Sequence, residues 1–251
     1  PEGFVSSEPI FRIRFSESMN EDRTIISLTD GINHYGHWKD GEYVILKRET
    51  VSLKRLDSGE KVHREMVRLN WDPELSQKGG YPHYMLKEIH EQPETIEAAL
   101  KADDVKISDL CTSIQDAHRV YLMGVGTTFY VAQTAQYYFH QLTGKHLIAV
   151  SSDEFEYVAE VDKNTLVIAF SQSGETYDTL NALRYAARGG AKTAAVINVM
   201  GSTMVNEVDI PIMQNSGPEI CVLSTKAATA QIVISIRVAL ELGKLNGHLS
   251  P

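Results

Sequence analysis

The stretch Thr165-Leu-Val-Ile-Ala-Phe170 runs directly into Ser171-Gln-Ser-Gly-Glu-Thr176, and these two segments decide the fold. The first is an apolar run rich in β-branched residues, which predicts a buried strand of a parallel sheet. The second is a hydroxyl-rich turn in which Gly174 can take a positive φ. Apolar residues then recur on one face of residues 177–188, which predicts a helix that Gly189 and Gly190 end. The two segments therefore predict a strand, a turn and a helix in succession.

The turn is a candidate anion site. Unpaired backbone N–H groups, the positive end of the following helix and the hydroxyls of Ser171, Ser173 and Thr176 would converge there. The turn contains no Lys or Arg, so dipoles and hydroxyls would hold a phosphate. The alternative is that these hydroxyls only cap the helix. Capping needs one hydroxyl, whereas the turn offers three together with Gln172, so we favour the ligand interpretation.

The pattern around this unit repeats from Arg119 onward, with apolar runs alternating with helical segments. This alternation predicts an α/β fold with a parallel, doubly wound sheet and right-handed crossovers, in which ligands bind beyond the carboxyl ends of the strands. The predicted strands are 120–123, 146–151, 165–170, 193–199 and 210–213, and the predicted helices are 129–142, 155–161, 177–188, 202–207 and 227–245.

Two further turns are candidates for the same site. Gly124-Val-Gly-Thr-Thr128 lacks the third glycine of a dinucleotide fingerprint, and its N–H groups with Thr127 and Thr128 suit a sugar phosphate better. The alternative is an ordinary glycine turn with a Thr cap. In Cys221-Val-Leu-Ser-Thr-Lys226, Ser224 and Thr225 either cap the last helix or meet a ligand. Lys226 either contacts a phosphate or carbonyl group or is a solvated or structurally paired charge.

The residues before this region predict a different organisation. Residues 1–70 contain short alternating runs with turn signals between them, which predicts a small β-rich segment with antiparallel pairing. The predicted strands are residues 11–15, 24–28, 43–46, 51–56 and 62–69. Residues 71–104 predict a Pro- and Gly-containing linker followed by connecting helices, and residues 105–251 the α/β domain. His34-x-x-His37 and the other scattered histidines lack partners at ligand spacing, so we predict no metal site.

The overall composition excludes several classes of partner. With 251 residues, 43% apolar residues and a net charge of −9, the chain can bury a core but does not suit nucleic acid or an anionic membrane. No apolar run predicts a membrane span or signal peptide. Cys111 and Cys221 are expected to be reduced thiols, which predicts a cytoplasmic protein. Because the chain begins at Pro1, we expect a fragment of a longer protein.

Several of these motifs also resemble those of one enzyme family. The run Gln77-Lys-Gly-Gly-Tyr-Pro-His-Tyr-Met-Leu-Lys-Glu-Ile-His-Glu-Gln-Pro93 is similar to the linker of the glutamine–fructose-6-phosphate aminotransferase (isomerizing) family, the glucosamine-6-phosphate synthases. Gly126-Thr-Thr, the Ser171–Thr176 turn and Leu223-Ser-Thr-Lys226 resemble the first sugar-isomerase (SIS) domain of that family. Residues 38–69 weakly resemble the closing strands of its glutaminase domain. The resemblance covers roughly residues 70–251.

The resemblance implies a SIS-type, flavodoxin-like five-stranded parallel sheet with flanking helices, and a binding site for fructose 6-phosphate or glucosamine 6-phosphate. It implies no cofactor. Val125 stands where the family often has Cys, which should alter packing more than chemistry. The residues that match the hexose-phosphate site of the family are Gly126, Thr127, Thr128, Ser171, Gln172, Ser173 and Thr176, with Val222 and Ser224 lining the sugar.

The resemblance also implies what this chain lacks. The N-terminal cysteine nucleophile that releases ammonia is absent, and neither Cys111 nor Cys221 replaces it. The second SIS domain, which carries the isomerising residues, is absent too. The chain is thus expected to be a catalytically incomplete portion of the aminotransferase that forms a homodimer and packs against a second SIS domain. The alternatives are a tandem-SIS sugar-phosphate deaminase or fructosamine deglycase, and a non-catalytic SIS module that senses a phosphosugar.

Overall fold

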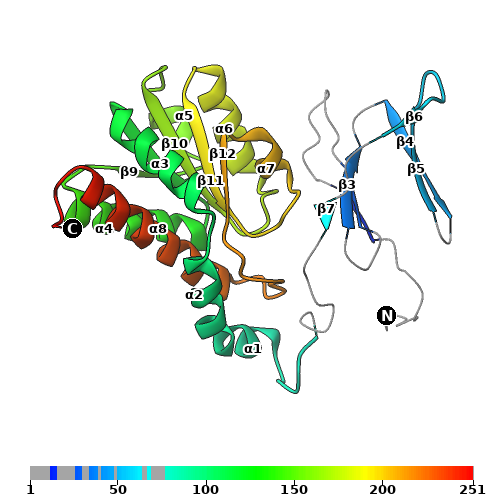
Figure 1. Ribbon diagram of the computed structural model, residues 1–251, viewed down its shortest axis with the longest axis horizontal. Helices are drawn as coiled ribbons and strands as arrows, with labels where there is room; N and C mark the ends of the chain where they lie inside the picture. The colour runs from blue at the N-terminus through cyan, green and yellow to red at the C-terminus, as the bar shows by residue number, and fades with distance from the viewer. Residues whose placement is uncertain are drawn as a thin grey trace. The chain divides into compact units, whose positions relative to one another are not determined.

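The computed structural model describes residues 12–15, 26–29, 34–38, 41–47, 50–63, 67–68 and 77–250. The chain separates into two compact units, residues 1–73 and residues 74–251. Figure 1 labels the helices and strands of each unit.

The described residues of the first unit form two antiparallel sheets, in the strand orders β1-β2-β3-β7 and β4-β5-β6. Antiparallel pairing is what the alternating runs predict. The predicted strand over residues 62–69 is wrong, because two short strands belonging to different sheets stand in its place. His34 and His37 lie in a strand that the sequence pattern did not reveal. The strands are β1 (Arg12–Phe15), β2 (Ile26–Thr29), β3 (His34–Trp38), β4 (Glu42–Lys47), β5 (Thr50–Arg55), β6 (Lys61–Val62) and β7 (Val67–Arg68).

The second unit is built on a five-stranded sheet in the order β12-β11-β10-β8-β9, and every pair in it is parallel. The predicted fold class is thereby confirmed. Every residue of the central strand β10 is buried, as its continuous apolar run predicts. The strands are β8 (Arg119–Gly124), β9 (Ile148–Ser151), β10 (Thr165–Ser171), β11 (Lys192–Ile197) and β12 (Ile210–Met213).

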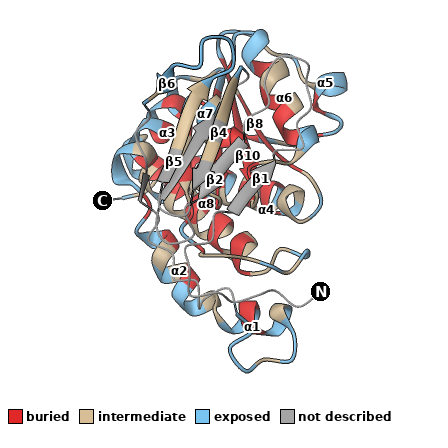
Figure 2. Ribbon diagram, turned by 90° about the vertical axis from the view of Figure 1, so that its right-hand side faces the viewer, coloured by how far each residue is buried: buried red, intermediate tan, exposed pale blue. Residues whose placement is uncertain are grey.

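Helices cover both faces of this sheet, and alternate residues of β10 supply the two cores (Figures 1 and 2). Leu166, Ile168 and Phe170 pack with α3, α4 and α8, whereas Val167 and Ala169 pack with α5, α6 and α7. The helices are α3 (Asp104–Asp116), α4 (Thr127–Thr143), α5 (Phe155–Val158), α6 (Tyr177–Arg188), α7 (Thr203–Glu207) and α8 (Lys226–Leu245).

Two short helices precede the sheet and belong to the same compact unit. Helix α1 (Tyr84–His90) and helix α2 (Gln92–Leu100) meet at Glu91, which is the C-cap of the first and the N-cap of the second. Helix α2 packs against α8. The predicted helices after the linker are therefore present. Of the predicted linker, residues 71–76 lie outside the described residues.

Candidate functional site

The position of the site follows from the strand order. Strand β8 lies between β9 and β10 in the sheet. The chain passes from β8 to β9 on one side of β8 and then crosses back to β10 on its other side, so the direction in which strands are added reverses between β8 and β10. Such a reversal leaves a crevice beyond the carboxyl ends of the two strands, where ligands of open α/β sheets bind. The pairing of Met123 with Ala169 sets these ends level, so that the turns beginning at Gly124 and Ser171 flank the reversal. The structure thus brings two of the three predicted turns together.

The turn after β10 is folded by its own hydroxyls. Ser171 Oγ accepts a hydrogen bond of 2.9 Å from Gly174 N and lies 3.4 Å from Thr176 Oγ1. Ser173 Oγ accepts from Glu175 N at 3.1 Å. Thr176 is the N-cap of α6 but makes no side-chain capping bond. In the structure, the side chain of Thr176 therefore does not cap α6. A serine oxygen that accepts an N–H can still donate its own proton, which is what an anion requires.

Glu175, the carboxylate of this turn, bonds the start of α7. Glu175 Oε1 accepts from Thr203 N at 2.8 Å, and Gly174 O accepts from Met204 N at 3.1 Å. Gln172 O accepts from Val199 N at 3.3 Å, so the segment after β11 holds the turn along its length. Ser202 is the N-cap residue of α7, but its side chain makes no capping hydrogen bond. The carboxylate of Glu175 instead accepts the hydrogen bond from Thr203 N at the start of α7.

The two threonines of the turn after β8 differ in their hydrogen bonding. Thr128 Oγ1 accepts from Val125 N and donates to Val125 O, at 2.9 Å each. The hydroxyl of Thr127 has no hydrogen-bond partner in the described part of the chain. Gly126, at φ +59°, is exposed and is the N-cap of the 17-residue helix α4. The geometry therefore leaves Thr127 and the start of α4 available to an anion, while Thr128 closes the turn.

The third predicted segment, residues 221–226, is organised by carboxylates. Ser224 Oγ donates to Glu219 Oε2 at 3.0 Å, and Glu219 Oε1 accepts from the backbone N–H groups of Thr225 and Ala227. Val222 is fully exposed. In the described residues no hydrogen bond joins Val222 or Ser224 to the other two turns. The structure thus leaves this segment as a separate loop between β12 and α8.

Lys226 is a structurally paired charge. Its side chain is 4% exposed, and its Nζ lies 2.7 Å from Glu91 Oε2, while Lys87 Nζ lies 2.7 Å from Glu91 Oε1. Burial alone would raise the pKa of Glu91, but the hydrogen bonds from Lys226 and Lys87 outweigh it and hold this pKa below its usual value. Of the alternatives for Lys226, the structural pairing is the correct one.

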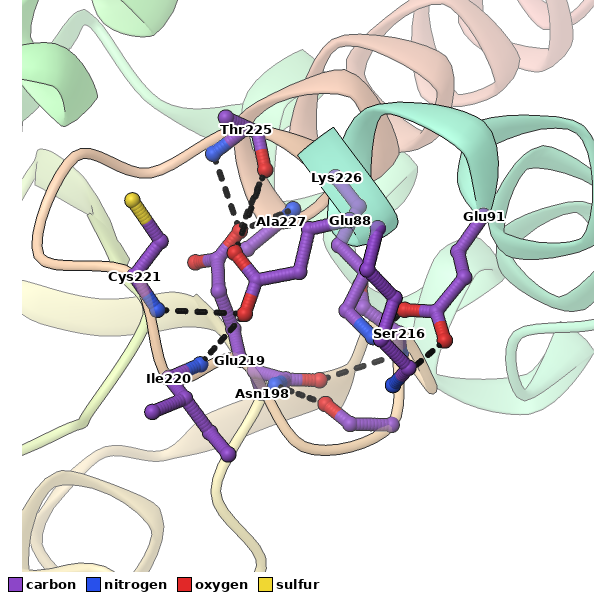
Figure 3. A network of polar contacts seen from close by, with 12 residues as sticks. Glu88, Glu91, Asn198, Ser216, Glu219, Ile220, Cys221, Thr225, Lys226 and Ala227 are labelled. Atoms are coloured by element: carbon purple, nitrogen blue, oxygen red, sulfur yellow. Dashed lines mark hydrogen bonds and ion pairs between the residues drawn. The ribbon is translucent and has the colours of Figure 1, made fainter. Parts of the chain in front are cut away.

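Sequence reasoning missed the carboxylates that shape this loop. Glu88 is 1% exposed and accepts from the backbone N–H groups of Ile220 and Cys221, more than a hundred residues away in the chain (Figure 3). In the sequence, Glu88 follows Lys87 in a short helix, where such charged residues usually face solvent. Its near-complete burial is the informative feature, because a carboxylate is rarely buried without bonded partners.

A cavity of about 370 Å³ lies elsewhere, on the outer side of α4 beside β9. None of the predicted binding residues lines it, and the strand reversal is the better guide because both anion-type turns meet there. The residues lining the cavity are Tyr130, Gln133, Thr134, Gln136, Tyr137 and Ala149.

A parallel sheet of this strand order, with two hydroxyl-bearing turns at its reversal, defines a doubly wound α/β protein with a candidate anion site at the carboxyl ends of its strands. The chain belongs to the SIS domain family, whose model matches residues 113–240, about half of the chain.

The similar proteins bear out the resemblance seen in the motifs. The glutamine–fructose-6-phosphate aminotransferase (isomerizing) of Methanocaldococcus jannaschii is 44% identical over 84% of this chain, and that of Methanococcus maripaludis is 42% identical over 83%. The chain spans only 19% and 35% of these relatives. A solved structure of the C-terminal domain of glucosamine-fructose-6-phosphate aminotransferase from Francisella tularensis is 32% identical, with a TM-score of 0.63, over 70% of this chain and 52% of that one.

Proposed function

We propose that this chain is the sugar-phosphate-binding portion of a glutamine–fructose-6-phosphate aminotransferase, which makes glucosamine 6-phosphate from fructose 6-phosphate and glutamine. The observation that carries the proposal is the pair of turns flanking the strand reversal, at Gly126–Thr128 and Ser171–Thr176. The similarity to aminotransferases of that name over most of the chain supports the choice of substrate.

The chemistry of the two turns suits a phosphate monoester. Phosphate oxygens accept hydrogen bonds, and both turns contain donors. These are the hydroxyl of Thr127 and the hydroxyls of Ser173 and of the buried Ser171, whose oxygens already accept backbone N–H groups. The N-termini of α4 and α6 add their positive dipole ends. Neither turn contains Lys or Arg, so binding would depend on dipoles and hydroxyls.

The remaining assignments complete the proposal. Gln172 and Thr176 would complete the site, with Val222 and Ser224 facing the sugar. Residues 1–70 would be the tail of a glutaminase-type domain, residues 71–104 a connecting segment and residues 105–251 the SIS domain. In the described helices, no segment is long and apolar enough to span a bilayer. We propose a cytoplasmic homodimer in which ammonia release and isomerisation require parts of the protein outside this chain.

Calorimetric titration of the chain with fructose 6-phosphate and glucosamine 6-phosphate tests the proposal, with fructose and ribose 5-phosphate as comparison ligands. Ser171→Ala combined with Ser173→Ala should weaken hexose-phosphate binding by about 1–3 kcal/mol. Ser108→Ala with Thr112→Ala removes two exposed hydroxyls from α3 and should leave binding unchanged. Unchanged affinity in the folded Ser171/Ser173 variant would remove the phosphate role of this turn. Equal binding of fructose and its phosphate would overturn the proposed function.

A further inference from the structure

Glu88 is a buried carboxylate that the proposed binding site does not use. Its Oε1 accepts from Ile220 N at 2.6 Å and from Cys221 N at 3.1 Å, and its Oε2 lies 3.5 Å from Thr225 Oγ1 (Figure 3). Burying a charged carboxylate is costly unless donors satisfy it. The partners of Glu88 are the two ends of one loop, so the cost of its burial is offset by fixing that loop.

The loop has little else to hold its middle in place. Ile220 is 45% exposed, Leu223 is 54% exposed and Val222 is fully exposed, so burial of apolar surface does not fix them. Glu219 secures the segment that leads into α8 through Ser224, as described above. The conformation of the exposed middle therefore depends on the two carboxylates at its ends.

Helix α1, which carries Glu88, is tied to the same loop by ion pairs. Glu91 bridges Lys87 of α1 and Lys226, the residue that directly follows the loop. A helix of seven residues has little stability of its own, so these contacts fix α1 and the loop relative to each other. The segment before the SIS domain thus holds this loop in place through Glu88 and Glu91.

We propose that Glu88 is a positioning residue for sugar recognition: through the backbone of Ile220 and Cys221 it sets the loop that presents Val222 and Ser224 to the sugar. This inference rests on the proposed function, because it takes the 222–224 stretch as the sugar-facing part of the site. Glu88 acts on the loop and does not touch the ligand. Since the phosphate would bind at the other two turns, loss of Glu88 should affect the sugar portion of the ligand selectively.

The reactivity of the Cys221 thiol can report on the conformation of the loop, because Cys221 is one of the two cysteines of the chain and is half-buried. The other, Cys111, is 3% exposed, and burial raises the pKa of its thiol to about 12, so it should react slowly in the folded protein. The rate at which a disulfide reagent such as DTNB modifies the native protein therefore reports on Cys221. This readout does not require any bound sugar.

The experiment compares Glu88→Ala, Glu88→Gln and Glu88→Asp with wild type and with Glu94→Ala, which removes an exposed carboxylate from α2. Glu88→Ala should accelerate thiol modification by at least about tenfold and weaken fructose 6-phosphate binding by about tenfold, since it removes hydrogen bonds to a charged group. Affinity for inorganic phosphate should change by less than about twofold. Glu88→Gln retains an acceptor oxygen and should remain closer to wild type, with Glu88→Asp between the two.

The outcomes separate the inference from the proposed function. If the wild type binds fructose 6-phosphate and the Glu88 variants do so equally well despite faster thiol modification, the positioning role is overturned. If thiol modification is unchanged in every folded variant, Glu88 does not hold the loop and the inference is also overturned. If the wild type itself binds no phosphosugar, the proposed function fails and the sugar role of Glu88 fails with it. Should Glu88→Ala not fold, the graded response of the Gln and Asp variants decides between these outcomes.

Discussion

Ser202 Oγ occupies the space that a side chain on Gly174 would need, because it lies 2.0 Å from the position that a Cβ atom of residue 174 would take. Ser202 Cβ is 2.6 Å from the same position, and Gly174 has a φ of +68°. The anion-type turn after β10 and the segment leading into α7 are therefore packed so closely that only glycine fits between them. This contact, together with the bond from Thr203 N to Glu175, fixes the shape of the turn before any ligand binds.

We expect Gly174→Ala to lower the free energy of unfolding by about 2–5 kcal/mol, because it adds a left-handed backbone penalty to a steric clash. Gly247→Ala is the matched control, since Gly247 has a φ of +75° and no atom within 4 Å of its Cβ position. The control should lose only about 1–2 kcal/mol. Urea denaturation of both variants measures the difference. Equal losses would show that Ser202 moves aside without cost.

The two neighbouring threonines after β8 should respond oppositely to the same change. Thr127→Val should weaken phosphosugar binding by about 1–3 kcal/mol with little effect on stability, since the Thr127 hydroxyl bonds no described group. Thr128→Val should lower stability by about 1–3 kcal/mol, because it leaves Val125 N without its acceptor. Calorimetry and urea denaturation of each variant separate the two effects. A Thr127 variant that binds as well as wild type would exclude this hydroxyl from the site.

The ion pairs of Glu91 predict a dependence of stability on pH. The pKa of Glu91 is lowered from its ordinary value of 4.5, since its hydrogen bonds with Lys226 and Lys87 outweigh the opposing effect of burial. A carboxyl group with a lowered pKa in the folded state stabilises the protein above its unfolded pKa, and this contribution is lost as the pH falls through the folded value. Glu91→Gln should therefore cost up to about 3 kcal/mol at pH 7, and less as the pH falls below 4.5.

Urea denaturation of wild type and Glu91→Gln between pH 7 and pH 3 tests this dependence, because the difference between the two proteins removes the contribution of other carboxyl groups. Glu97→Gln is a suitable control, since Glu97 forms an exposed pair with Lys101. A difference between wild type and Glu91→Gln that stays constant across this pH range would argue that Glu91 does not titrate as described.

The fold of the second unit could be predicted because its signals are local. The buried strand β10 and the turn after it follow from one apolar run and one hydroxyl-rich segment. In contrast, β3 (His34–Trp38) is short and contains two histidines and a glycine, so its pattern did not indicate a strand. The predicted strand over residues 62–69 divides between two sheets, and such pairing depends on distant partners rather than on local alternation.

The site was only partly predictable for the same reason. The sequence indicates which turns carry hydroxyls, but not that Thr128 closes its own turn while Thr127 has no described partner. It also cannot show that Glu88 reaches Ile220, since the two residues are far apart in the chain and share no periodic pattern. Which hydroxyls remain available to a ligand is decided by contacts that form only when the chain is folded.

Arg237 provides the last prediction, because its guanidinium joins three helices. Nη1 donates to Leu100 O at 3.0 Å and to Ala102 O at 2.7 Å, Nη2 pairs with Asp104, and Nε donates to Glu241. Burial would lower the pKa of Arg237, but its hydrogen bonds with the two carboxylates outweigh this and raise it. The planar fork thus satisfies the carbonyl of Leu100 at the end of α2 and that of Ala102 in the connection to α3, and it binds the start of α3 to α8.

Arg237→Lys keeps the charge but replaces five donors in a fixed plane with one compact ammonium group. The variant should lose about 1–3 kcal/mol of stability, because one ammonium group cannot reach both backbone carbonyls and both carboxylates that the guanidinium contacts. Arg188→Lys, at an exposed position in the last turn of α6, should be close to neutral in the same urea denaturation measurement. Phosphosugar affinity should be unchanged in both variants, since Arg237 contacts neither candidate turn. If the two Lys variants were equally stable, charge alone and not the guanidinium geometry would hold the α2–α3 connection against α8.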